Sequence, residues 1–195
     1  DKSRPGIIDS DNEHVLKIKW NDIEGLEELL NMHGNDIACF ISSPYDHPVS
    51  RDNTLPEEGY WKKITSLCKQ YEVLTIVDDV RAGFRINLAG SNVAFDFSPD
   101  MICFGKAIAN GHPLASLVGT EKLKHSAEKV YFTGTQFFSA PPMAAALATL
   151  DQLQKVNAPN KLIEYGENLN RRLVKVAEKE GFNLIASGIP SMPYY

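Results

Sequence analysis

The sequence predicts an α/β fold in which a mostly parallel sheet is flanked by helices. Three short apolar runs of strand length, 37–42, 73–77 and 101–104, are each bounded by polar residues, a pattern that favours buried parallel strands. Segments with apolar residues at helical spacing follow the first and third of these runs. Strands that alternate with helices along a chain are typical of a parallel sheet covered by helices.

The first half of the chain contains further predicted elements. Residues 15–20 alternate in polarity as a strand does, and residues 21–30 form a short helix that Asn-Asp opens. The run Thr54–Glu57 has the spacing of a capping box, with Pro56 in the expected first turn. Apolar side chains then recur at helical spacing over 61–71, which predicts a helix there.

The second half of the chain predicts a fourth strand and two helices. The strand is expected at 114–118. An alanine-rich helix over 144–153 is entered through Pro141–Pro142, and a long amphipathic helix follows over about 160–180. Gly181 is expected to end this helix in a left-handed conformation. A new strand is expected to begin near the last residues of the chain.

Composition excludes several classes of partner. The 195 residues carry a formal net charge of -5, whereas nucleic acids and anionic membranes require a basic surface. No apolar run of about 18 residues is present to span a membrane. Three cysteines without C-x-x-C spacing argue against a disulfide framework or a zinc site, so we expect a cytoplasmic protein.

Both ends of the sequence lead us to expect an internal fragment of a longer protein. The chain begins at Asp1 without an initiator methionine, and it stops just after a Gly-Ile-Pro turn. A targeting peptide would then lie outside the sequence, and the fragment alone is expected to be inactive.

Charged side chains follow two of the predicted strands. Asp78 and Asp79 end the second strand, and Gly105 and Lys106 follow the third. In open α/β sheets, ligands bind beyond the carboxyl ends of the strands. The acid and the lysine could therefore face one bound molecule, or they could form a structural ion pair or a helix cap.

Two kinds of ligand chemistry use an acid and a lysine in this way. In phospho-acceptor receiver domains a proline follows the lysine and an acid ends an intervening strand, but here Ala107 follows Lys106 and no such strand intervenes. Pyridoxal phosphate (PLP) needs a lysine for its aldehyde and a carboxylate for its pyridine nitrogen. Desolvation at a strand end would lower the pKa of such a lysine and make it a nucleophile.

No other motif competes with this interpretation. The sequence contains no G-x-G-x-x-G, Walker or G-x-S-x-G pattern, and its histidines show no metal-ligand spacing. His47 and His112 lie in loops that could border a site, although solvent-facing histidines are the more common case.

Four motifs, in order and at the expected spacing, resemble class III, fold-type I aminotransferases. Residues 74–85 (LTIVDDVRAGFR) are similar to LLIFDEVxTGFR, and 98–111 (SPDMICFGKAIANG) to TPDLTTLGKxIGGG. Residues 113–119 match the strand after it, and 131–135 resemble the start of the Gly-Thr motif before an alanine-rich helix. By these motifs the glutamate-1-semialdehyde 2,1-aminomutases are the most similar members. The resemblance implies part of a three-layer large domain of a PLP enzyme.

The resemblance also implies residue roles. Lys106 matches the lysine that forms the Schiff base with PLP and moves the proton, and Asp78 matches the partner of the pyridine nitrogen. Val80 matches the aliphatic residue against the cofactor ring. Thr135, with Gly134, matches the group that reaches the cofactor phosphate of the neighbouring subunit. A homodimer with its site at the interface, acting on a small amino compound, is therefore expected.

Domain boundaries follow from the same resemblance. Residues 1–155 are expected to belong to the PLP-binding large domain, and 156–195 to a linking helix and the start of a small domain. The phosphate loop and the aromatic that stacks on the cofactor would lie outside the sequence. The isolated chain is therefore expected to hold PLP weakly or not at all.

Departures from the family pattern leave the reaction open. Asp79 replaces the usual Glu, Ala109–Gly111 replaces a glycine triplet, and 136–140 (QFFSA) places two aromatics near the site. These changes put an aminomutase substrate in doubt and favour a transaminase as the alternative. A PLP decarboxylase or epimerase, or a non-catalytic PLP-fold binding protein, would retain the same fold.

Overall fold

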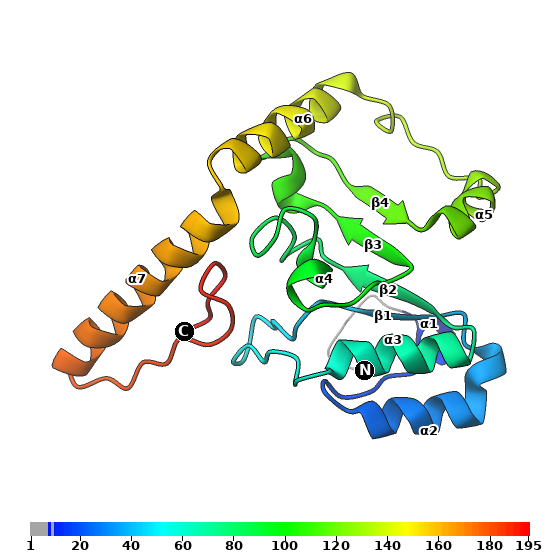
Figure 1. The fold of residues 1–195 in the computed structure, drawn as a ribbon, viewed down its shortest axis with the longest axis horizontal. Coiled ribbons are helices and arrows are strands. Elements are labelled where there is room, and N and C mark those ends of the chain that lie inside the picture. The colour runs from blue at the N-terminus through cyan, green and yellow to red at the C-terminus, as the bar shows by residue number, and fades with distance from the viewer. Residues whose placement is uncertain (1–7, 9) are drawn as a thin grey trace.

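The core of the protein is one four-stranded sheet. The computed structural model describes residue 8 and residues 10–195 (Figure 1). The strands follow the order β1-β2-β3-β4, in which β1 to β3 run parallel and β4 runs antiparallel to β3. Their bounds are β1 Cys39–Ser42, β2 Leu74–Asp78, β3 Met101–Phe104 and β4 Ser116–Gly119. The predicted α/β class with a mostly parallel sheet is thereby confirmed.

Helices connect the strands and extend beyond the sheet. They are α1 Ser10–Glu13, α2 Ile23–His33, α3 Tyr60–Gln70, α4 Ser91–Ala94, α5 Lys124–Glu128, α6 Ala140–Lys155 and α7 Ala158–Lys179. Short 3₁₀ helices are η1 Gly34–Asp36, η2 Lys106–Ala109 and η3 Glu121–Leu123. The predicted helices of the first half and the two long helices of the second half are all present, with ends shifted by a few residues.

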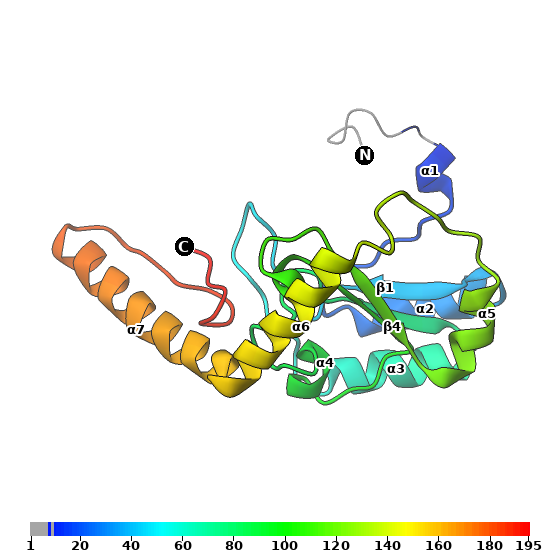
Figure 2. The ribbon, with the colours of Figure 1, turned by 90° about the horizontal axis from the view of Figure 1, so that it is seen from above.

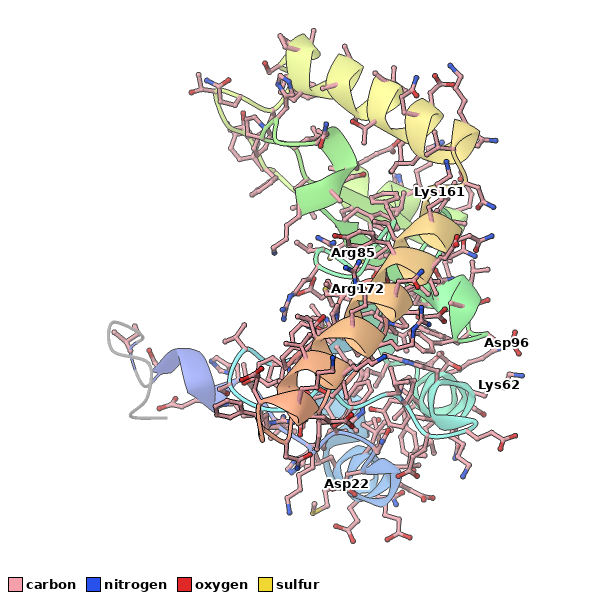
Figure 3. All side chains as sticks on the ribbon, turned by 90° about the vertical axis from the view of Figure 1, so that its left-hand side faces the viewer. Asp22, Lys62, Arg85, Asp96, Lys161 and Arg172 are labelled. Atoms are coloured by element: carbon pink, nitrogen blue, oxygen red, sulfur yellow. The ribbon has the colours of Figure 1, made fainter. Side chains whose placement is uncertain are left out.

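Helices α2 and α3 cover one face of the sheet and form the main core (Figure 1). Asp22 begins α2, because its carboxylate accepts a hydrogen bond from Gly25 N at 2.9 Å. Trp61 of α3 is buried and stacks on Phe97 with ring centroids 4.1 Å apart. At the surface, Lys62 forms an ion pair with Asp96, which ties α3 to the turn after α4 (Figure 3).

The opposite face of the sheet is more open than the sequence predicts. Ile41 of β1 is 60% exposed and Leu117 of β4 is 58% exposed. The strand formed within the run 37–42 is β1, which lies at the edge of the sheet, and its predicted burial is wrong within the part of the chain that the structure describes. An apolar run shows that a strand is suited to burial. Whether the strand is buried depends on which other segments of the chain cover it.

Two local predictions are also wrong. The strand predicted at 15–20 is not present: these residues pair with no described strand, and only Ile18 and Trp20 pack against the main core, with the Trp20 ring 4.9 Å from Tyr60. The capping box at Thr54 does not form, since the Thr54 backbone pairs with Asp46 in an isolated bridge. Helix α3 instead begins after Gly59, whose φ of 75° suits glycine.

Helix α7 extends away from the sheet, and the last residues fold back toward it (Figure 2). Gly181, with φ 80°, follows the helix as predicted. The expected new strand is limited to one bridge between Ser187 and Tyr194. Ser187 Oγ accepts a hydrogen bond from Asn53 N at 2.9 Å, so this segment is tied to the loop after β1.

Candidate active site

Asp78 and Lys106 lie at the same edge of the sheet. Asp78 is the last residue of β2 and pairs in register with Cys103 of the parallel strand β3. Lys106 follows Cys103 by three residues and begins η2. Because β2 and β3 are parallel neighbours, both side chains start from the carboxyl edge of the sheet, where α/β proteins bind ligands.

The Asp78 carboxylate is free to accept a ligand. Its Oδ1 accepts a hydrogen bond from Val80 N at 3.1 Å, and the side chain is exposed. No ion pair within 4.0 Å involves Asp78 or Lys106 in the described part of the chain. The structural ion pair considered as the alternative is therefore not formed between these two residues.

The turns that follow β2 and β3 pack closely against each other. A Cβ atom added to Gly105 would lie 3.2 Å from Val80 Cγ1, a tight approach at which Val80 would have to shift by a few tenths of an ångström. Lys106 has φ 42°, which non-glycine residues rarely adopt and which clusters at functional sites. Its side chain is exposed, so the desolvation expected at this lysine is not supplied by the described residues.

Asp79 has a different environment from Asp78. It is 1% exposed and accepts hydrogen bonds from Ser91 N at 2.8 Å and Ser91 Oγ at 2.6 Å. Burial raises the pKa of Asp79, and the hydrogen bonds from Ser91 oppose this effect. Asp79 therefore holds the first residue of α4 against the strand end, whereas the Asp78 side chain remains exposed.

An arginine that the sequence analysis did not single out borders this edge. Arg81 Nη1 donates a hydrogen bond to the carbonyl oxygen of His47 and lies 3.3 Å from His47 Nδ1. The ring of His47 lies 4.8 Å from that of Tyr45. The expectation that His47 faces solvent is wrong, since its side chain is half-buried, whereas His112 is exposed. The sequence contained one signal for this arginine, because Arg81 follows Asp78, the acid at the end of β2, by three residues.

Burial is the main influence on His47. It lowers the pKa of His47, and the positive charge of Arg81 lowers it further. The negative charges of Asp78 and Asp46 act in the opposite direction. The charges of Asp78, Arg81 and Asp46 therefore all act on His47 across the strand ends.

Gly134 and Thr135 lie in the exposed loop between α5 and α6. Gly134 O accepts a hydrogen bond from Phe137 N at 3.1 Å. Within the described residues, no hydrogen bond joins this loop to Asp78 or Lys106. The loop also carries the two predicted aromatics, of which Phe138 is 89% exposed.

Other site types find no support among the described residues. They contain no group of three or more histidines, cysteines and acidic residues that could hold a metal ion. None of the helices described is long and apolar enough to cross a membrane.

Known proteins resemble the chain over nearly its full length. It is 35% identical over 188 residues to an aminopentol aminotransferase of Sphingopyxis macrogoltabida, covering 96% of this chain and 44% of the relative. It is 33% identical over 183 residues to a 3-aminobutyryl-CoA aminotransferase of Cloacimonas acidaminovorans, covering 93% and 44%. A glutamate-1-semialdehyde 2,1-aminomutase of Legionella pneumophila is 33% identical over 193 residues, covering 97% and 44%. The chain thus spans less than half the length of these relatives.

Solved structures and a family model agree with these relatives. The FumI protein of Sphingopyxis sp. MTA144, in its PLP internal aldimine form, has a TM-score of 0.92 and 34% identity, covering 96% of this chain and 45% of its own. An acetylornithine aminotransferase from Elizabethkingia anophelis has a TM-score of 0.70 and 30% identity, covering 84% and 41%. The family model for aminotransferase class-III matches residues 7–187. The chain belongs to the class-III aminotransferase family.

Proposed function

We propose that the protein containing this chain transfers amino groups with PLP as cofactor, as a class III aminotransferase or a glutamate-1-semialdehyde aminomutase-like enzyme. The observation that carries the proposal is the placement of Asp78 and Lys106 beyond the carboxyl ends of adjacent parallel strands, with neither engaged in an ion pair in the described residues. A carboxylate and an amine held apart in this way suit the two ends of one aromatic cofactor.

The residues present fit PLP. Asp78, whose Oδ1 has one donor in Val80 N, retains acceptor capacity for a protonated ring nitrogen. Lys106 would hold the aldehyde carbon, and its amine would later move a proton at the substrate α-carbon. Val80, packed beside Gly105, would contact the ring. When bound, PLP supplies an electron sink that makes the α-proton removable.

The phosphate would be bound by the loop of Gly134 and Thr135 from a neighbouring subunit. Both residues are exposed, and a backbone turn with a hydroxyl offers donors to a phosphate. Exposed aromatic side chains in the same loop, such as Tyr131 at 92% and Phe132 at 79%, favour burial against a second copy. The proposed assembly is therefore a homodimer with the site at its interface.

Residues 1–155 are proposed to belong to the large domain, of which residues 1–7 and 9 lie outside the described residues. Residues 156–195 are proposed to link it to a small domain. Two features support this division: α6 ends at Lys155, and Asn157 interrupts the helices with φ 49°. The proposed partner is a small amino compound, in keeping with the aminotransferase family. The negative net charge disfavours nucleic acid or an anionic membrane as partner, and the three free cysteines favour a reducing compartment such as the cytoplasm.

Borohydride reduction of the full-length protein with PLP, followed by peptide mass spectrometry, tests the proposed function. Reduction should leave a pyridoxyl group on the peptide that contains Lys106, and Lys106→Ala should abolish the label. Lys122→Ala, at an exposed lysine on the surface, is the matched control and should leave the label in place. An unlabelled Lys106 under saturating PLP would contradict the proposal.

A further inference from the structure

Arg81 is a half-buried cation without a carboxylate partner. No carboxylate lies within 4.0 Å of its guanidinium in the described part of the chain. Charged groups that are partly removed from water are normally paired, because desolvation of an unpaired charge is costly. The site therefore contains a positive charge whose counter-ion is not provided by the described residues.

The acids near Arg81 are already engaged. Asp46 pairs with Arg51, with 2.5 Å between the nitrogen and the oxygen, and Asp79 accepts two hydrogen bonds from Ser91. Asp78 accepts one from Val80. None of these three carboxylates pairs with Arg81. The Arg81 guanidinium is therefore available to an anion that the described residues do not supply.

His47 holds the guanidinium in place. Arg81 Nη1 donates to the His47 carbonyl, and the same nitrogen lies 3.3 Å from Nδ1. Because arginine has no acceptor and stays protonated, Nδ1 must present its lone pair, which places the ring proton on Nε2. His47 is therefore neutral in this arrangement, in agreement with the direction in which burial and Arg81 shift its pKa. A fixed guanidinium loses less entropy when it binds an anion.

Arg81 lies in the same turn as the proposed cofactor residues. It follows Asp78 by three residues and Val80 by one, and Val80 lies beside Gly105, where an added Cβ atom would be 3.2 Å from Val80 Cγ1; Gly105 in turn precedes Lys106. An anionic group on a molecule that reacts at Lys106 would thus meet a cation fixed at the adjacent strand end. The planar guanidinium suits the two oxygens of a carboxylate.

We propose that Arg81 binds the carboxylate of a substrate that reacts at Lys106, with His47 as the residue that positions its guanidinium. This inference rests on the proposed function and assigns a substrate class to the site. It also separates Arg81 from the cofactor residues, because loss of Arg81 should weaken carboxylate binding and leave PLP binding intact.

The test uses full-length protein loaded with PLP, a carboxylate-free amine at fixed concentration as amino donor, and three probes: pyruvate and acetaldehyde as amino acceptors, and propionate as an unreactive carboxylate. Arg81→Gln should raise KM for pyruvate and Kd for propionate about 10- to 100-fold, as expected for a lost charge-assisted hydrogen bond. KM for acetaldehyde, which has no carboxylate, should stay unchanged. Arg81→Lys should restore part of the loss.

Two further variants sharpen the result. Arg171→Gln removes the same charge from an exposed arginine of helix α7, and it should change none of the three constants. His47→Ala should raise KM for pyruvate less than Arg81→Gln does, because the backbone carbonyl that holds Nη1 remains.

Three outcomes would overturn the inference: equal losses with pyruvate and acetaldehyde, no binding of propionate to the unsubstituted protein, or weaker PLP binding in Arg81→Gln with propionate binding unaffected. The last outcome would assign the arginine to an anionic group of the cofactor. Propionate binding measured by calorimetry requires no turnover, so it tests Arg81 even if Lys106 fails to hold PLP. A failed Lys106 label with intact Arg81-dependent propionate binding would refute the proposed function alone.

Discussion

Trp61 combines three kinds of interaction at one residue of the main core. Its side chain is 2% exposed, its indole Nε1 donates to Pro44 O at 2.8 Å, and its ring stacks on Phe97 with an interplanar angle of 5°. Pro44 lies in the loop that follows β1. Trp61 therefore ties α3 both to the segment between α4 and β3 and to the loop that contains His47.

Substitutions at Trp61 should separate the hydrogen bond from packing. Trp61→Ala should lower the free energy of unfolding by about 3–5 kcal/mol, because a large buried ring is lost. Trp61→Phe should retain the stack on Phe97 and cost about 1–2 kcal/mol, from the lost volume and the unpaired Pro44 carbonyl. Urea unfolding measures both values; an equal loss for the two variants would contradict this division.

Asp100 joins the start of β3 to β2 through its carboxylate. Oδ2 accepts hydrogen bonds from Thr75 N at 2.9 Å and Thr75 Oγ1 at 3.0 Å, and Lys122 forms an ion pair with Oδ1. Burial alone would raise the pKa of Asp100, but the hydrogen bonds from Lys122 and Thr75 outweigh it and lower the pKa below 3.8. The charged form is therefore the one that the fold stabilises.

The pH dependence of stability should report this carboxylate. A depressed pKa contributes stability above the usual value of 3.8, and this contribution is lost as pH falls toward the folded-state pKa. Asp100→Asn should lower the free energy of unfolding at pH 7 by about 1 kcal/mol, and the difference should shrink below pH 3.8. Glu121→Gln, an exposed acid nearby, serves as control; a difference independent of pH would contradict the assignment.

At the scale of elements, the ends of helices depend on what the flanking backbone already binds. Thr54 has the residue type of a helix cap, but its backbone is paired with Asp46, so α3 begins after Gly59. Helix α7 shows a different constraint. A Cβ atom at Gly166 would lie 1.8 Å from Pro190 O, so the final segment packs against the helix only where the side chain is absent.

Gly166→Ala should release the final segment from α7. Alanine favours the helix by up to about 1 kcal/mol over glycine, but the collision is with backbone and has no flexible end that could move aside. The amides of Ser187 and Tyr194, which bond each other's carbonyls at 2.9 and 3.0 Å, should therefore exchange hydrogen faster. Glu167→Ala, at the neighbouring exposed position, should leave their exchange unchanged, and protection preserved in Gly166→Ala would disprove the packing.

At the scale of the whole molecule, the described residues leave apolar surface uncovered in two places. One is the open face of the sheet, with Ile41 and Leu117, and the other is the loop before α6, with Phe132 and Phe138. Exposed apolar surface of this kind is typical of interfaces. The loop also contains Gly134 and Thr135, so a subunit contact there would place these residues at a boundary between copies.

Removing the aromatics should weaken the proposed homodimer. Phe132→Ser with Phe138→Ser should raise the dimer dissociation constant by at least about 10-fold, because burial of one large apolar side chain is worth about 1.5–3 kcal/mol. Sedimentation equilibrium of the full-length protein measures the constant. Met32→Ser, at a 66% exposed residue of α2, is the control, and an unchanged constant in the double variant would place the interface elsewhere.

The sequence by itself determined the positions of the four sheet strands, the long helices, and the Asp78 and Lys106 strand ends, because polarity patterns and turn residues act over a few neighbouring positions. Only the tertiary structure decided which strand lies at the edge, where α3 begins, and how Asp79 is satisfied. It also brought Arg81 to His47, 34 residues away in the chain. Such contacts depend on which distant groups meet after the chain folds, and no local pattern encodes them.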